Sequence, residues 1–351
     1  MGLGCYSFGG DKTTGQHLGE KNASLHKGVW GHQDDQDTIA TVELALSKGV
    51  NFFDTAEMYG DGYSEQILGE ALKKSGYHRS QYYVATKISE TFLQSDSIRQ
   101  HLLASLSRLQ LDYVDLYQIH WHSRAAVRSD KYSERPLKQE VPLMETLTSM
   151  ALLQAEGRIN HIGVCNFGVR DISTVLASGI RVSSNQVPYN LLWRGVEHEL
   201  VQLCVDNSIS ILPWGALNQG LLTGKFICAD DVPPGRARSR LFSSARSQQR
   251  HGEPGLEEET FTTIHHIKEI SHQLGHSISN VSLAWLAQQF GVSSMMVGAR
   301  NPQQLLNNLA FTTCQLTKSD NEALNYCTLD LKTKLGANLD PYESEEYSRI
   351  Y

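Results

Sequence analysis

Short apolar runs alternate with amphipathic segments along almost the whole chain of 351 residues. The runs are rich in β-branched and aromatic side chains, which is typical of buried strands. We predict strands near residues 2–5, 50–54, 82–87, 113–120, 159–165, 182–187, 208–213 and 294–298. We predict helices near residues 37–48, 64–75, 96–108, 141–156, 169–178, 195–206, 260–289 (as two helices) and 302–311.

The helical segments have recognisable faces and ends. Ile39, Val42 and Leu46 recur at the spacing of one helix face, and Gly49 and Gly76 suit the left-handed position after a last turn. Strands that alternate with helices predict right-handed βαβ units and a parallel sheet. Since no low-complexity tract or Pro-rich linker divides the chain, we predict an α/β fold, a (β/α)8 TIM barrel, as a single domain over residues 1–351.

Three long loops interrupt the alternation. They span residues 11–36, 123–140 and 227–258, and each follows a predicted strand. Loops in these positions lie on the C-terminal rim of such a barrel, where they shape substrate pockets.

Composition excludes several classes of function. A net charge of -7 and a pI near 6.1 argue against a nucleic-acid partner. No apolar stretch approaches the roughly 20 residues that cross a bilayer, and we expect no secretory signal at the N-terminus. The six cysteines are scattered and form no CxxC pair, so we predict reduced thiols and a cytoplasmic protein. The pattern specifies no oligomeric state.

Four polar residues stand at or just past the ends of predicted strands: Asp54, Tyr59, Lys87 and His120. The carboxyl ends of neighbouring parallel strands converge on one face of a barrel. A phenol near an ammonium, with a carboxylate and an imidazole nearby, is suited to passing a proton to a carbonyl oxygen.

Longer motifs surround these residues in a fixed order. They are Gly49–Gly60, Val84–Lys87, Asp112–Trp121, Gly157–Phe167, Asn185–Asn190, Gly220–Lys225 and Val297–Pro302. Together they resemble the aldo-keto reductase family over essentially the whole chain.

That resemblance implies reduction of an aldehyde or ketone with NADPH and without a metal. Tyr59 is then the general acid, and Lys87 brings the phenol pKa down from about 10. Asp54 holds Lys87 in place, and His120 orients the carbonyl oxygen of a small-molecule substrate.

The cofactor is not held by a Rossmann fingerprint, because the stretch Gly2–Ser7 has the first two glycines of that motif but a serine, Ser7, in place of the third. The resemblance instead implies that Asn166 and Gln186 bind the carboxamide, with Cys165 in place of the usual serine. Trp214 would stack on the nicotinamide. Backbone amides of three further residues would approach the pyrophosphate: Leu217, Gln219 and Gly220.

The adenosine end has its own physical basis. Asn301 suits a helix N-cap and Pro302 the first helical position, so free amides face an anion there. Arg300 can form paired hydrogen bonds with a 2′-phosphate, and the resemblance places Gln304 and Asn308 on the adenosine. These features predict NADPH/NADP+ as the cofactor.

Two departures from the family pattern affect these expectations. The family has a β-hairpin before the first strand, whereas this chain begins almost at that strand, so we expect a barrel floor without it. His122 stands where a proline usually follows the His-Trp pair, which changes the pocket rim.

Two alternatives stay open at this point. His120-Trp121-His122 is the kind of pair that binds zinc in barrel hydrolases, although further ligands are then needed. The second alternative is a regulatory subunit that binds the cofactor, like the potassium-channel β subunits of the same family.

Overall fold

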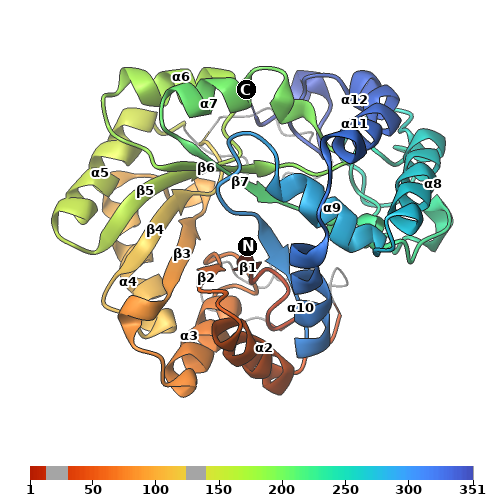
Figure 1. Cartoon of the computed structure of the whole chain (residues 1–351). Helices are drawn as coiled ribbons and strands as arrows, with labels where there is room; N and C mark the ends of the chain where they lie inside the picture. The colour runs from red at the N-terminus through yellow and green to blue at the C-terminus, as the bar shows by residue number, and fades with distance from the viewer. Residues whose placement is uncertain (13–30, 124–139, 351) are drawn as a thin grey trace.

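The computed structural model describes residues 1–12, 31–123 and 140–350. Eight parallel strands form a barrel, as the alternating pattern predicted. They are β1 (Gly2–Gly4), β2 (Phe52–Asp54), β3 (Tyr83–Ile88), β4 (Val114–Ile119), β5 (Ile159–Cys165), β6 (Ser184–Pro188), β7 (Ser210–Trp214) and β8 (Met296–Gly298). Figure 1 looks into the barrel, with the strands around a common centre.

The strand order is β7-β6-β5-β4-β3-β2-β1-β8, so each strand lies beside its sequence neighbours and β1 also pairs with β8. The remaining seam, between β7 and β8, is bridged just before β8. There the Ile211 amide donates to Gly291 and the Ser293 amide donates to Ile211. The sheet therefore closes on itself, and all the strands point their carboxyl ends to one rim.

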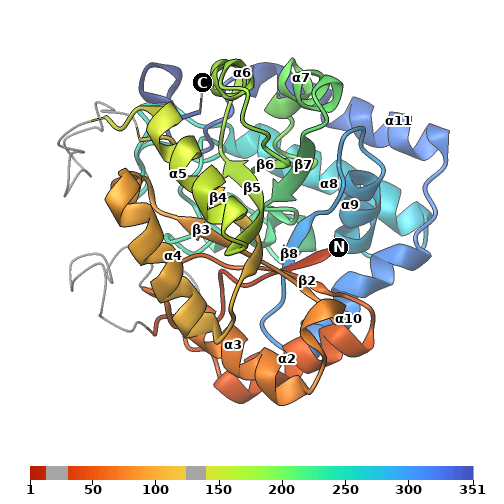
Figure 2. The same ribbon diagram turned by 90° about the vertical axis from the view of Figure 1, so that its left-hand side faces the viewer.

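Helices surround the strands on the outside (Figures 1 and 2). They are α2 (Asp35–Ser47), α3 (Tyr63–Ser75), α4 (Ser95–Leu109), α5 (Leu143–Ala155), α6 (Val169–Ala177), α7 (Leu200–Asp206), α8 (Glu257–Gln273), α9 (Ile278–Ala287), α10 (Pro302–Leu309), α11 (Lys318–Cys327) and α12 (Leu329–Leu335). Among the described residues, no helix combines the length and apolar character needed to span a bilayer.

Most helix boundaries fall within a few residues of those expected. Gly49 and Gly76 have positive φ angles of 79° and 72°, as their predicted positions require. The expected helix near 195–206 is split into a short 3-10 helix, Gly195–Glu197, and α7. The sequence pattern did not predict α11 and α12, which pack against α8 outside the ring.

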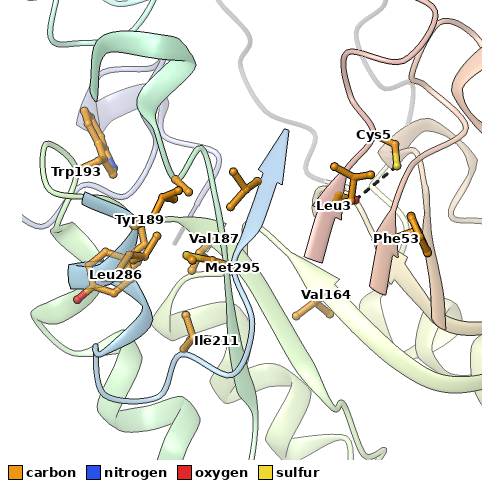
Figure 3. Close-up of a cluster of buried hydrophobic side chains, with 14 of the residues drawn as sticks. Leu3, Cys5, Phe53, Val164, Val187, Tyr189, Trp193, Ile211, Leu286 and Met295 are labelled. Atoms are coloured by element: carbon orange, nitrogen blue, oxygen red, sulfur yellow. Dashed lines mark hydrogen bonds between the residues drawn. The ribbon is translucent and has the colours of Figure 1, made fainter. Parts of the chain in front are cut away.

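The core lies between the strands and the helix ring, and it is continuous around the barrel. Figure 3 shows part of it, where Leu3 and Phe53 lie near Val164 and, further across, Ile211 and Met295. All five side chains are buried. The Cys5 thiol donates to the Leu3 carbonyl at 3.5 Å, and all six cysteines are unpaired thiols, as expected. This rigid core fixes the strand ends that bear the site.

The predicted loops 11–36 and 123–140 fall mostly outside the described residues. The third loop, 227–258, is described and contains one short 3-10 helix, Ala229–Asp231. It runs from the end of the β7 region to the start of α8.

Candidate active site

A buried ion pair lies at the ends of β2 and β3. Asp54 is the last residue of β2, and the fully buried Lys87 is the next-to-last residue of β3. Lys87 Nζ donates to Asp54 Oδ2 at 2.6 Å, to the Thr55 carbonyl at 2.8 Å and to the Tyr59 hydroxyl at 3.2 Å. Each of the three ammonium protons has an acceptor, which offsets the cost of burying the charge.

The lysine keeps its charge in this environment. Burial acts to lower the pKa of Lys87, but the charge of Asp54 and then Tyr59 outweigh it, and the pKa lies above the ordinary lysine value. Lys87 is therefore a permanent ammonium beside the Tyr59 hydroxyl.

Two amides fix the carboxylate. Gln186 and Gln118 donate to Asp54 Oδ1 at 2.8 Å and 3.1 Å. Gln186, which we expected at the cofactor carboxamide, thus has its amide nitrogen on Asp54. Gln118 was not predicted at the site, although it lies on β4 two residues before His120, which is the spacing of one strand face.

The phenol of Tyr59 lies among aromatic rings. Its ring centroid is 4.8 Å from that of Tyr6 and 5.8 Å from that of His120, which meets it edge-on. Burial raises the pKa of Tyr59, and the opposing charge of Lys87 does not cancel this effect. The expected net lowering of this pKa is therefore wrong, because desolvation of the phenolate outweighs the lysine.

A chain of hydrogen bonds joins the ends of β4, β5 and β7. Asn166 Nδ2 donates to the His120 carbonyl at 3.0 Å, and Trp214 Nε1 donates to Asn166 Oδ1 at 2.9 Å. Cys165 lies between the two predicted carboxamide ligands, with its sulfur 3.2 Å from Asn166 Nδ2 and 3.8 Å from Gln186 Oε1. These contacts bring Asn166, Gln186 and Trp214 to the four polar residues.

A cavity lies beside Trp214, and its lining includes Gln219, Arg236, Ser239 and Tyr342. Tyr342 stacks on Trp214 with the ring planes 14° apart, and its hydroxyl accepts from Gln219 Nε2 at 2.8 Å. Tyr342 belongs to the segment after α12 and was not predicted at the site. A long-range contact of this kind has no local signal in the sequence.

The backbone after β7 turns sharply. Gln219 and Gly220 have positive φ angles of 53° and 99°, and Leu217 accepts the Gly220 amide at 2.9 Å. Side-chain atoms of Lys225 lie 3.3 Å from where a Gly220 Cβ would be. A glycine at this point therefore permits the close approach of Lys225 as well as the left-handed turn.

The start of α10 has the predicted cap. Asn301 accepts the Gln304 amide at 2.9 Å, and Pro302 occupies the first helical position. Gln304 Oε1 accepts the Arg300 amide at 3.0 Å, and Asn308 Nδ2 donates to the Gly298 carbonyl at 3.1 Å. Arg300 Nε donates to Gln33 Oε1 at 2.9 Å, and Arg300 also donates to the His32 carbonyl.

Three cations approach one another between the β7 turn and α10. Burial, and then the charges of Arg236 and Arg300, lower the pKa of Lys225. Within the described ranges, neither Lys225 nor Arg300 forms an ion pair with a carboxylate. We call Lys225, Arg236 and Arg300 the cationic cluster. Like charges gathered at a helix N-terminus suit an anionic ligand.

The metal alternative finds no support in the same region. In the part of the chain that the structure describes, no three His, Cys, Asp or Glu side chains are grouped so that they could hold a metal ion. His120 instead contacts Tyr59, and the His122 ring lies 5.7 Å from that of Phe167.

The profile of the aldo/keto reductase family matches residues 18–328, most of the chain. The chain belongs to the aldo/keto reductase family. This is a family of oxidoreductases that use nicotinamide cofactors.

Individual aldo-keto reductases agree with this membership. The chain is 30% identical to aldo-keto reductase YhdN of Bacillus subtilis, over 93% of this chain and 88% of the relative. It is also 30% identical to the NADH-specific methylglyoxal reductase of Escherichia coli, over 91% of each. The solved structure of the thermostable aldo-keto reductase Tm1743 with the inhibitor epalrestat superposes with a TM-score of 0.67 at 25% identity, covering 93% of this chain and 94% of that one. Other relatives bear the name of voltage-gated potassium channel β subunits.

Proposed function

We propose that this aldo-keto reductase reduces an aldehyde or ketone to an alcohol with NADPH, and that Tyr59 is the general acid. The observation that supports this most directly is the contact between the Tyr59 hydroxyl and the buried Lys87 ammonium, at 3.2 Å. The same phenol also contacts the rings of Tyr6 and His120.

The raised pKa of Tyr59 is consistent with this role. The phenol stays protonated at neutral pH, so its proton is available when a substrate arrives. NADPH, when bound, would supply a hydride to the carbonyl carbon. The carbonyl oxygen becomes strongly basic as this occurs, and Tyr59 gives it a proton. Lys87 then stabilises the phenolate that remains, with Asp54 fixing the lysine and His120 orienting the oxygen.

The chain's residues fit a phosphorylated nicotinamide dinucleotide. Asn166, Gln186 and Trp214 would surround the nicotinamide, and the backbone at Leu217, Gln219 and Gly220 would hold the pyrophosphate. Arg300, Asn301, Gln304 and Asn308 would hold the adenosine and its 2′-phosphate. The physical support is the cationic cluster, since its mutual repulsion is relieved by a ligand with several negative charges.

A regulatory role is the second candidate, because relatives of the chain carry the name of potassium channel β subunits. Such a subunit would bind the cofactor without appreciable turnover. We favour the enzyme, because Asp54, Tyr59, Lys87 and His120 lie together at the rim and the first three share hydrogen bonds.

A panel of aromatic and aliphatic aldehydes and ketones, followed by NADPH absorbance, tests the proposal. We expect turnover with some of them, and loss of nearly all of it in Tyr59→Phe while NADPH still quenches the protein fluorescence. NADPH binding with no turnover of any carbonyl would favour the regulatory subunit. Unchanged turnover in Tyr59→Phe would remove Tyr59 from the reaction.

A further inference from the structure

The loop between β7 and α8 places an arginine one side chain away from the proposed acid. The Arg238 guanidinium lies within hydrogen-bonding range of the Tyr6 hydroxyl. The Tyr6 ring contacts the Tyr59 ring, with centroids 4.8 Å apart. Arg238 also acts electrostatically on Tyr342, which stacks on Trp214. Arg238 therefore lies one side chain away from Tyr59, and the Tyr6 ring stands between them.

The charges of two nearby arginines are already compensated. Arg349 forms two hydrogen bonds to the carboxylate of Asp340, at 2.8 Å and 2.9 Å. Arg250 faces the carboxylate of Glu343 at 3.8 Å. Both therefore have a counter-charge in the protein itself.

Arg238 differs from both neighbours. Among the described residues it forms no ion pair, and its buried Nε atom has no hydrogen-bond partner. The Tyr6 hydroxyl is neutral and does not compensate a guanidinium. A half-buried cation with an unused donor is costly unless a ligand supplies an anion.

We propose that Arg238 binds an anionic group on the substrate, so that the preferred substrates are carbonyl compounds with a carboxylate or phosphate. This inference rests on the proposed function. The planar guanidinium suits two oxygens of either group. Because one aromatic ring, that of Tyr6, stands between Tyr59 and Arg238, we choose test substrates whose carbonyl and anion are separated by one aromatic ring.

Matched substrate pairs test the proposal. para-Carboxybenzaldehyde is compared with its methyl ester, and glyceraldehyde phosphate with glyceraldehyde. In the wild type we expect kcat/KM to be about 10- to 100-fold higher for at least one anionic member than for its neutral partner. The pair that shows the preference identifies the anion as carboxylate or phosphate.

Substitutions then assign the preference to one residue. Arg238→Met should bring the ratio close to one, Arg238→Lys should retain part of it, and the matched control Arg250→Met should retain most of it. A wild-type ratio near one, or a ratio preserved in Arg238→Met, would overturn the inference. An equal loss in Arg250→Met would overturn it too, since the general positive field would then be the cause.

A binding measurement separates this inference from the proposed function. Calorimetry follows binding of the alcohol para-hydroxymethylbenzoate to the protein saturated with NADP+. We expect binding that weakens about tenfold or more in Arg238→Met and much less in Arg250→Met. If neutral and anionic carbonyls alike give no turnover while this difference persists, the proposed function fails and the anion site stands. If neutral carbonyls are turned over and the difference is missing, the anion site fails and the proposed function stands.

Discussion

The pair Asp54–Lys87 and the cationic cluster both place charged side chains on the same barrel rim. They differ in whether those charges are neutralised by partners within the protein. Lys87 has all three of its acceptors within the protein, and its pKa is raised. Burial, and then the like charges of its neighbours, lower the pKa of Lys225. A group that must hold a fixed position during chemistry is compensated internally, whereas a group that binds an anion is left for the ligand to compensate.

Removing the lysine of the compensated pair should have the largest effect. Lys87→Met leaves the Asp54 carboxylate buried without a counter-charge, so we expect a loss of about 3–5 kcal/mol of unfolding free energy. Turnover should fall about 100- to 10,000-fold because the phenolate loses its stabilising charge. Urea denaturation and NADPH oxidation measure the two effects.

The double variant Asp54→Asn with Lys87→Met provides the control for stability. It removes both charges, so it should recover much of the unfolding free energy without recovering turnover. Normal turnover in either variant would mean that Lys87 takes no part in the reaction.

The cationic cluster is tested by Arg300→Ala. We expect the Kd of NADPH to rise about 10- to 100-fold, because a charge-assisted contact to the 2′-phosphate is lost, while the Kd of NADH changes by less than about twofold. Fluorescence titration measures both. Arg99→Ala, which removes an exposed arginine of α4, controls for net charge. Equal weakening of both cofactors would place Arg300 away from the 2′-phosphate.

A smaller effect is expected at the amides that hold Asp54. Gln118→Leu removes one of the two donors to Oδ1 and leaves Gln186 in place. We expect kcat to fall about three- to tenfold, the equivalent of one hydrogen bond, while NADPH binding is preserved. Steady-state kinetics with a saturating carbonyl substrate measure it. A change in the Kd of NADPH with kcat unaltered would contradict this role.

The smallest effect concerns pH. In the ligand-free protein, burial and then the neighbouring cations lower the pKa of Lys225, whereas a bound phosphate would raise it. Binding at alkaline pH must therefore take up protons, and the Kd of NADPH should rise by about two- to fivefold between about pH 7 and about pH 10. Titrations across this range measure it, and Lys225→Arg should flatten the dependence. A Kd that falls as pH rises would contradict the assigned sign.

The grouping of Asp54, Tyr59, Lys87 and His120 was predictable, because strand ends are set by local patterns. Asp54 and Lys87 end adjacent parallel strands, so their contact follows once the barrel is inferred. The cap formed by Asn301 and Pro302 was predictable for the same reason, since its signal lies within a few residues.

What the sequence did not predict depends on burial and on distant segments. Tyr342 contacts Gln219 across 123 positions of sequence. Arg238, in the loop after β7, acts on Tyr6, which follows β1. Spacing alone does not reveal such contacts. The predicted direction of the Tyr59 pKa shift was wrong, because the sequence indicates that a lysine is nearby but does not indicate how deeply the phenol is buried.

The pairing of β1 with β8 has a consequence for how the protein is made. Gly2, Leu3 and Gly4 pair with Met296, Val297 and Gly298, so β1 is synthesised long before β8, its neighbour in the sheet. A nascent chain on the ribosome therefore exposes an unpaired β1 edge during most of translation, and closure of the ring is a late event with high contact order. We expect chaperones that bind during synthesis to contact mainly this unpaired edge of β1.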